Sequence, residues 1–486
     1  MSDFKDGRRV FLTAWPVYAA FWNPWLQSTM TKSLLDQAVS FVDTNEWALA
    51  HYNLYSTDAI SLQGRWLTVH PPGLAWLVTP FYLLWRVLVG QAETAETFQV
   101  FNGFLVFVLA ATSSAFAAVQ VAWLARWLGA ARPGQLWAAA LFAFGTQSFV
   151  FGTMLLKEGL CGAAVVTSFR LAIEPGGFSR RTASGAVACV ATAFTYQAGL
   201  LVPVLLALVG WREGRRPAMG FFLGCAPVLI ALGIYNTVLF GLPWRTAYYF
   251  ATAEAHFGFG MPTVTVLAGL LLGPEKGAGV LLYAPFLVLG LAGLARTGRL
   301  GRAGEAAAVG CFVVGLWLVV GAWQSEFHAH PFAGLTIGHR MLYPAIPLLA
   351  AFAGPLLEQI PVGWRLVCAM PSFFFSYLNV QAGFIPGGAD QLPYALKTWI
   401  SGTGMGVLFK EALPVWLGLD TLHTVVSRPD VSAEDLLRLL PTPEGFILIR
   451  NQLIFLVLNL AVLCCLAWFL RKLWAGSKEG EQRVRQ

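Results

Sequence analysis

Residues 64–73 have the sequence Gly64-Arg65-Trp66-Leu67-Thr68-Val69-His70-Pro71-Pro72-Gly73. They end a polar segment that contains Asp43 and Asp58 and lies between two apolar stretches of the chain. Carboxylates beside a hydrocarbon phase are costly, so their presence there needs a reason. An acidic segment held between membrane helices therefore favours an enzyme that works at the membrane surface over a simple channel.

The composition is that of a polytopic membrane protein. Of the 486 residues, 57% are hydrophobic and only 12% are charged, whereas a soluble domain has about 25% charged residues. All seven cysteines lie within apolar segments, without CxxC or CxxH spacing. Neither a disulfide framework nor a zinc site is therefore indicated.

Long apolar runs mark the membrane helices, and clusters of Lys and Arg mark their cytoplasmic ends. Together they predict an all-α membrane protein with about twelve transmembrane helices and both termini in the cytoplasm. The predicted spans are residues 10–27, 98–123, 135–156, 158–174, 183–197, 199–211, 218–240, 279–295, 304–323, 341–357, 363–381 and 446–470.

Two regions need a special arrangement. Residues 183–211 have basic clusters at both ends, which two short helices broken near Tyr196 and Gly199 satisfy, provided that protein covers the break. Residues 73–90 cannot cross fully without placing Arg126 and Arg132 on the outer side. We expect this segment to form a re-entrant or interfacial helix.

Charge divides between the two sides of the membrane. Lys and Arg gather inside, whereas the acidic excess and all seven histidines fall outside. The net charge of +7 is thus an orientation signal and requires no nucleic acid. We expect long outer loops at residues 28–72, 241–278, 324–340 and 382–445. We expect a catalytic membrane module over 1–381, an extracytoplasmic loop region over 382–445, and a last helix with a basic tail over 446–486.

The first outer segment carries the acids best suited to catalysis. A carboxylate near a hydroxyl acts as a general base, and Asp43 and Asp58 are the candidates. As a pair they would instead hold a divalent cation through oxygen ligands. His70-Pro71-Pro72-Gly73 opens a helix whose free N–H groups favour an anion. The alternative is a solvated loop whose charges keep it out of the lipid.

Two further motifs place charge at outer helix ends. Lys157 and Glu158 interrupt an apolar run, either as functional groups or as a local ion pair. His339 and Arg340 begin a span, where a guanidinium matches the paired oxygens of a phosphate. Arginine at such a position is also commonly a snorkelling anchor.

Aromatic and amide side chains gather in the outer segment 241–278. Tyr248 follows Gly241-Leu242-Pro243-Trp244-Arg245, and Glu275 and Lys276 lie near its end. Such side chains suit stacking on a sugar ring, although anchoring at the headgroup level is more common.

In this order, the motifs resemble the GT-C superfamily of transferases that use polyprenyl-phosphate-linked sugars. Its bacterial relatives include aminoarabinose transferases and protein O-mannosyltransferases. Four pieces carry the resemblance, and the chain after residue 347 lacks such support. They are Asp43 and Asp58 before Gly64-Arg65-Trp66 and His70-Pro71-Pro72-Gly73; Tyr235-Asn236 with Phe240-Gly241-Leu242-Pro243; Gly273-Pro274-Glu275-Lys276-Gly277 with Tyr283-Ala284-Pro285; and Gly338-His339-Arg340 with Pro344 and Pro347.

The resemblance implies an inverting transfer of a sugar from a polyprenyl monophosphate to an acceptor hydroxyl on a glycan, lipid or protein. It implies a plasma (inner) membrane location with the active site on the extracytoplasmic face. Asp43 or Asp58 would be the base or would hold a divalent cation (Mg or Mn). The expected phosphate ligands are Arg340, His339, Lys157 and His70, the last in place of the lysine of many relatives. Further cavity candidates are Glu158, Tyr248, Glu275 and Lys276.

Two other classes of function compete with this interpretation. A transporter or flippase of a lipid-linked glycan would favour polar residues near the middle of the membrane and paired repeats, but here the charges gather at outer ends. The other is an inactive scaffold in which Asp43, Asp58 and Glu158 are structural.

Overall fold

The computed structural model describes residues 2–23, 28–50, 58–92, 94–250, 257–273, 279–325 and 339–382. The predicted cavity residues Glu275 and Lys276 lie outside this part of the chain. So do the loop region that follows residue 382 and the predicted last helix, 446–470.

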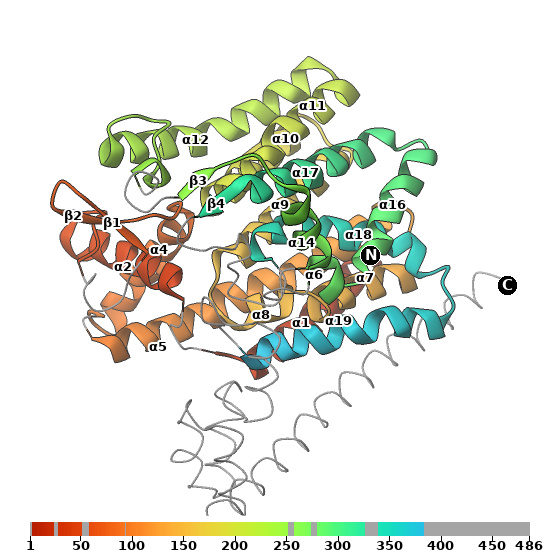
Figure 1. The fold of residues 1–486 in the computed structure, drawn as a ribbon, viewed down its shortest axis with the longest axis horizontal. Helices are drawn as coiled ribbons and strands as arrows, with labels where there is room; N and C mark the ends of the chain where they lie inside the picture. The colour runs from red at the N-terminus through yellow and green to blue at the C-terminus, as the bar shows by residue number, and fades with distance from the viewer. Residues whose placement is uncertain are drawn as a thin grey trace, which may run out of the picture.

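The described residues form a largely helical membrane protein (Figure 1). Four of its helices are long and apolar enough to cross a bilayer, and their bounds are Thr97–Trp127, Arg215–Phe240, Ala303–Ala322 and Arg340–Leu357. The count of twelve spans stays a prediction, because several predicted spans are shorter or broken.

The centre of the fold is a continuous helix built from α5 (Ala95–Leu105), a π-helical segment (Val106–Ala111) and α6 (Thr112–Trp127). Small residues let its neighbours approach closely. A Cβ atom built on Gly354 would lie 2.8 Å from the Cβ of Ala125. The helices packed around α6 are α1 (Ser2–Ala20), α7 (Arg132–Phe144), α9 (Lys157–Ile173) and α18 (Ile346–Leu357).

A second group of helices lies along one edge in Figure 1, opposite α19. It comprises α10 (Phe178–Phe194), a 3₁₀ segment (Tyr196–Leu200), α11 (Leu201–Glu213) and α12 (Arg215–Phe240). The predicted break near Tyr196 and Gly199 is confirmed. The backbones of α10 and α12 touch, because a Cβ atom on Gly185 would lie 2.0 Å from the carbonyl oxygen of Phe221.

The first outer segment is more ordered than a loop. It contains α2 (Thr29–Thr44) and an antiparallel hairpin of β1 (Ala59–Leu62) and β2 (Arg65–Thr68). The Ser28 side chain accepts a hydrogen bond from the N–H of Thr31 and so caps α2. Gln63 and Gly64 both have positive φ, 54° and 77°, as a two-residue hairpin turn requires. The prediction of a loop was wrong here.

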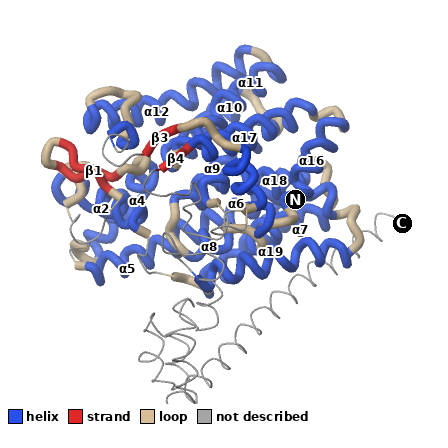
Figure 2. The backbone as a smooth tube through the Cα atoms, in the orientation of Figure 1, coloured by secondary structure: helices blue, strands red, loops and turns tan. Residues whose placement is uncertain are grey.

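A second short sheet joins β3 (Phe257–Phe259) to β4 (Trp323–Ser325), so the all-α prediction was wrong in detail (Figure 2). The outer segment 241–278 also contains the helix α14 (Val264–Leu272). Three further helical segments lie close to predicted spans: α17 (Ala303–Ala322), a 3₁₀ segment (Arg340–Ala345) that leads into α18, and α19 (Val362–Ala382).

Two predicted spans are broken. Residues 135–156 divide into α7 and α8 (Ser148–Thr153), with a turn between them. Residues 279–295 divide into α15 (Val280–Tyr283) and α16 (Leu287–Arg299). Pro285 lies between these two helices and cannot donate a backbone hydrogen bond. A hydropathy profile reports the length of an apolar run and does not detect such interruptions.

The segment 73–90 forms the helix α4 (Gly73–Leu88), which packs against α2. Tyr82 is buried, whereas Val87 and Leu88 are 82% and 72% exposed. Its apolar end therefore projects beyond the helical core. That it lies at the membrane interface stays a prediction.

Candidate functional site

Six side chains, most of them far apart in the sequence, meet where three helical segments begin. They are Thr29, Asp58, His70, Lys157, Glu158 and Arg340, and we call them the polar cluster. Thr29 is the first residue of α2, Lys157 begins α9, and Arg340 begins the 3₁₀ segment before α18. Helix N-termini carry free N–H groups and partial positive charge. The surroundings therefore favour an anion.

The hairpin positions the acid. Ala59 pairs with Thr68 across the two strands, so Asp58 lies opposite Val69, whose N–H donates to the Asp58 carbonyl oxygen at 3.4 Å. His70 is the next residue, and its Nε2 lies 3.3 Å from Asp58 Oδ2. The hydroxyl of Thr29 donates to the same oxygen at 2.7 Å.

His70 connects the acid to a buried amine. Its Nδ1 lies 3.3 Å from Lys157 Nζ. A lysine ammonium can only donate, so Nδ1 accepts and Nε2 carries the ring proton toward Asp58. The arrangement is carboxylate, neutral imidazole and ammonium in sequence. Asp58 is 36% exposed and His70 only 9%, so the carboxylate is the end that an acceptor can reach.

The surroundings fix the charge on each member of this chain. Burial and the charge of Lys157 lower the pKa of His70 to about 4. Burial opposes ionisation of Asp58, but the hydrogen bonds from His70 and Thr29 and the nearby positive charge together outweigh burial and lower the pKa of Asp58. Lys157 lies between two predicted spans, and burial lowers its pKa to about 8. At neutral pH the cluster therefore holds an anionic Asp58, a neutral His70 and a cationic Lys157.

Arg340 adds a second cation. Its Nη1 lies 3.8 Å from Glu158 Oε1 and 3.8 Å from the sulfur of Met30. The Nε of Arg340 and the Oε2 of Glu158 are buried, and neither has a hydrogen-bond partner among the described residues. A guanidinium offers five donors. Arg340 can therefore bind an oxyanion in addition to its long contact with Glu158.

Tyr248 lies beside the polar cluster. Its ring packs edge-on against Tyr196 and Trp323, with centroid distances of 6.3 and 5.8 Å. Burial raises the pKa of its hydroxyl, and the charges of Arg340 and Asp58 also act on it. An aromatic group therefore borders the cations.

No family model and no curated protein sequence matches the chain. Similar solved structures include ArnT from Cupriavidus metallidurans in the apo state, with 14% identity, a TM-score of 0.49, and coverage of 86% of this chain and 72% of that one. ArnT bound to undecaprenyl phosphate has 14% identity and a TM-score of 0.46, and the match covers 86% of this chain and 73% of that one. The Archaeoglobus fulgidus oligosaccharyltransferase, tethered with an acceptor peptide, has 12% identity and a TM-score of 0.45, and the match covers 86% of this chain and 58% of that one.

Asp43, the other candidate base, has different partners from Asp58. It lies in the last turn of α2, where it accepts a hydrogen bond from the Tyr82 hydroxyl at 2.9 Å. Its other oxygen lies 3.0 Å from Arg86 Nη1. Both partners belong to α4, so Asp43 ties α2 to α4. His339 is buried next to Arg340, at the start of the 3₁₀ segment.

Asp43 and Asp58 are the two acids predicted to hold a divalent cation, and they contact different side chains. Among the described ranges, no group of three or more His, Cys, Asp or Glu side chains could hold a metal ion. The requirement for Mg or Mn therefore stays a prediction. Thr29 is not among the predicted site residues, because a loop is expected there; its place after Ser28, at the start of a helix, is the signal in the sequence that indicates it.

Proposed function

We propose that this protein is a membrane glycosyltransferase that moves a sugar from a polyprenyl monophosphate to an acceptor hydroxyl on the extracytoplasmic face. One observation supports this most strongly. A reachable carboxylate, Asp58, is separated by a single neutral imidazole from the buried cation Lys157, and Arg340 lies close by. The order of the sequence motifs adds a resemblance to enzymes of this chemistry.

The spacing suits a direct displacement. A base lies about 3 Å from the proton-bearing oxygen that it activates. That oxygen attacks from about 3 Å, so the leaving oxygen is roughly 7 Å from the base. In the polar cluster, the His70 ring and its two 3.3 Å hydrogen bonds separate Asp58 from Lys157. In the proposed complex, the anomeric carbon of the sugar phosphate faces Asp58 and its phosphate faces the cations.

In the proposed step, the acceptor oxygen forms a bond to the anomeric carbon while the bond from that carbon to the phosphate oxygen breaks. The bonding electrons leave with the polyprenyl phosphate, and the acceptor proton passes to Asp58. Attack opposite the leaving group inverts the anomeric centre. Negative charge grows on the phosphate, so Arg340 and Lys157 bind the transition state more tightly than the ground state.

His70 has a positioning role in this scheme. Being neutral, it adds no charge to the phosphate side, but it holds Asp58 and Lys157 at a fixed separation. The hydroxyl of Thr29, at the start of α2, donates a hydrogen bond to Asp58 Oδ2, the same oxygen that His70 contacts.

Retained lipid provides the first test. The full chain, extracted gently from its own membranes, is examined by native mass spectrometry for polyprenyl phosphate or its sugar ester. We expect this lipid on the wild type and on Arg296→Gln, a control whose guanidinium donates to the Pro355 carbonyl oxygen away from the polar cluster. Arg340→Gln and Lys157→Met should lose most of it. Equal retention by all four proteins would contradict the phosphate assignment.

Transfer is measured next, with the donor that the spectrum identifies. Wild-type vesicles should release polyprenyl phosphate and gain a glycosylated acceptor in equal amounts. Movement of intact donor across the vesicle without sugar transfer would instead favour a transporter.

A further inference from the structure

Glu158 is the charged member of the polar cluster that takes no part in the proposed transfer. It follows Lys157 at the start of α9, and its side chain is only 4% exposed. Its Oε2 atom is buried and has no hydrogen-bond partner among the described residues. A buried carboxylate with an unsatisfied oxygen costs free energy. Its place beside the proposed phosphate site therefore calls for an explanation.

A stabilising ion pair does not explain this carboxylate. Its Oε1 atom lies 3.8 Å from Arg340 Nη1, whereas a charge-assisted hydrogen bond is about 2.7–2.9 Å long. Glu305 on α17 shows the contrast, because it is similarly buried and lies 2.9 Å from Arg212 Nη1. The contact between Glu158 and Arg340 is thus long enough to leave guanidinium donors available to another oxyanion. It also leaves a fixed negative charge beside them.

The charges of the polar cluster balance. Lys157 and Arg340 are the two cations, Asp58 and Glu158 are the two carboxylates, and the imidazole between them is neutral. Lys157 and Glu158 are 5% and 3% exposed, so water and salt screen their charges far less than charges at a surface. Without Glu158 the cluster would have one cation in excess.

This balance distinguishes two classes of lipid-linked sugar. A sugar joined to its lipid through one phosphate carries one negative charge, whereas a diphosphate link carries two. The second phosphate would bring another negative charge to a site whose cations are already matched by carboxylates. It would also lie near the buried carboxylate of Glu158, where like charges repel strongly. A repulsive group of this kind is a common source of specificity.

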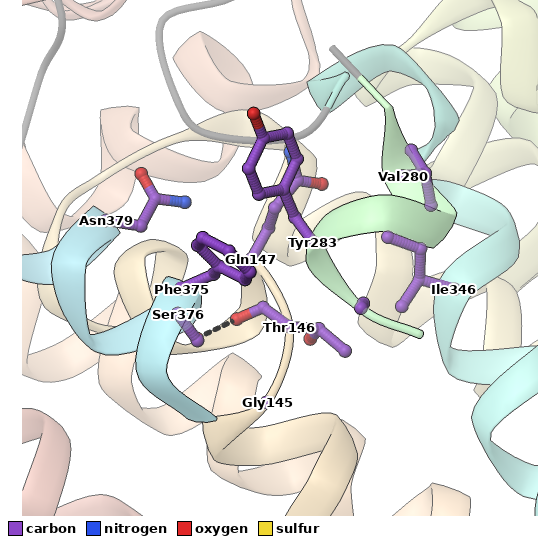
Figure 3. A pocket seen from close by; sticks show the side chains of 10 residues that line it. Gly145, Thr146, Gln147, Val280, Tyr283, Ile346, Phe375, Ser376 and Asn379 are labelled. Carbon is purple, nitrogen blue, oxygen red and sulfur yellow. Dashed lines mark hydrogen bonds between the residues drawn. The ribbon is translucent and has the colours of Figure 1, made fainter. Parts of the chain in front are cut away.

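A separate pocket, drawn in Figure 3, does not offer the second phosphate another place. It lies between the α7–α8 turn, α15 and α19, and its lining includes Gln147, Tyr283 and Asn379. None of the residues that line it is charged. A phosphate there would lie without a counter-charge. A diphosphate would therefore have to bind whole at the polar cluster.

We propose that Glu158 is a specificity-determining residue whose carboxylate rejects donors with a diphosphate link and so selects a monophosphate donor. The inference rests on the proposed function and assigns the choice of donor class to one side chain. Glu158 acts by its charge and exchanges no proton with the acceptor. Arg340 and Lys157 bind the phosphate that remains.

The test compares the affinities of polyprenyl phosphate and polyprenyl diphosphate of equal chain length for the full chain in detergent. EDTA is present, so that no divalent cation neutralises the diphosphate. The wild type should bind the monophosphate about tenfold more tightly or better. Glu158→Gln preserves the size of the side chain and removes its charge. It should raise diphosphate affinity about tenfold or more and monophosphate affinity only a few-fold.

Two controls separate charge from structure. Glu158→Asp retains the carboxylate and should keep the wild-type ratio of the two affinities. Glu305→Gln makes the same neutralisation at a buried, ion-paired glutamate in the first turn of α17, and it should also leave the ratio unchanged. Glu158→Ser, a smaller neutral variant, makes the same test if Glu158→Gln does not fold.

The ratio of affinities decides the proposal. A purely structural Glu158 would change both affinities by the same factor, and an unchanged ratio in the neutral variants would overturn the assignment. Equal affinity of the wild type for the two lipids would overturn it as well. Neither result would affect the proposed function, because the monophosphate would still bind. Failure of the wild type to bind either lipid would instead contradict the proposed function itself.

Discussion

Replacing Asp58 with Asn removes the proposed base with little disturbance of the polar cluster. The hydrogen bonds from Thr29 and His70 both end on Asp58 Oδ2. The carbonyl oxygen of an asparagine can take that place and accept both bonds, which leaves its amide nitrogen where the second carboxylate oxygen was. The variant should therefore fold and bind donor, yet lack an atom that accepts the acceptor proton.

The expected loss is large. General-base catalysis contributes about 10²–10⁴ in rate, which corresponds to about 3–5 kcal/mol in the barrier. We expect kcat of Asp58→Asn to fall by this factor, with KM for the donor changed only a few-fold. A low pKa makes Asp58 a weak base, so the effect should lie toward the lower end of the range.

Asp43→Asn is the matched control, being the same change on the neighbouring element. It weakens the ion pair with Arg86, whose side chain is 38% exposed, so the stability loss should be about 1 kcal/mol or less. Turnover should stay within a few-fold of the wild type. The expected signature is a small shift in melting temperature without a defect in the chemical step.

The assay is single-turnover transfer in vesicles, with excess enzyme and a radiolabelled donor, so that product release does not limit the rate. Retention of polyprenyl phosphate, measured on the same preparations, excludes a defect in binding. Near-normal rates for Asp58→Asn would refute the base assignment. A large loss in Asp43→Asn alone would transfer the role to Asp43.

Four further predictions concern the polar cluster and the hairpin that positions its acid. Arg340→Gln should weaken polyprenyl-phosphate affinity about 10–100-fold, the range for a charged hydrogen bond, in a lipid-titration assay. The pKa of His70 is lowered from 6.5 to about 4, so the folded state favours the neutral imidazole. Its contribution to the free energy of unfolding is complete above pH 6.5 and is lost as the pH falls toward 4, by about 3 kcal/mol in all. His70→Asn should therefore flatten the dependence of the melting temperature on pH over that interval. Donor affinity should fall above about pH 8, as Lys157 loses its proton, and Lys157→Met should abolish this fall. Gly64→Val places a β-branched residue at a φ of 77°, which costs about 1–2 kcal/mol, and should lower kcat while lipid retention persists.

Much of the membrane architecture was predictable from apolar length and from the positions of Lys and Arg. The break between α10 and α11 followed from charge alone, because basic residues at both ends ruled out a single crossing. The breaks at Gln147 and Pro285 did not follow, since hydropathy averages over a window that is longer than a turn. Each interruption is only a few residues long, so the hydropathy pattern gives no signal for it.

The candidate side chains were also recognisable as unusual charges at outer helix ends. Which of these side chains lie together in the fold was not recognisable from the sequence. Lys157 and His70 are 87 residues apart, and nothing in either motif specifies the other as its partner. Asp43 and Asp58 looked equivalent in the sequence, whereas in the fold Asp43 contacts two residues of α4 and Asp58 contacts Thr29 and His70. The choice between them depends on tertiary packing.

The hairpin accounts for the selection of Asp58. A two-residue turn at Gln63 and Gly64 sets the register that pairs Ala59 with Thr68, and this register places Asp58 beside the residue that precedes His70. A shift by one residue would turn the side chains of one strand to the opposite face and separate the acid from the imidazole. The Gln-Gly pair was the local signal in the sequence, weaker than Asn-Gly or Asp-Gly. The position of the proposed base thus depends on backbone geometry six residues away from it.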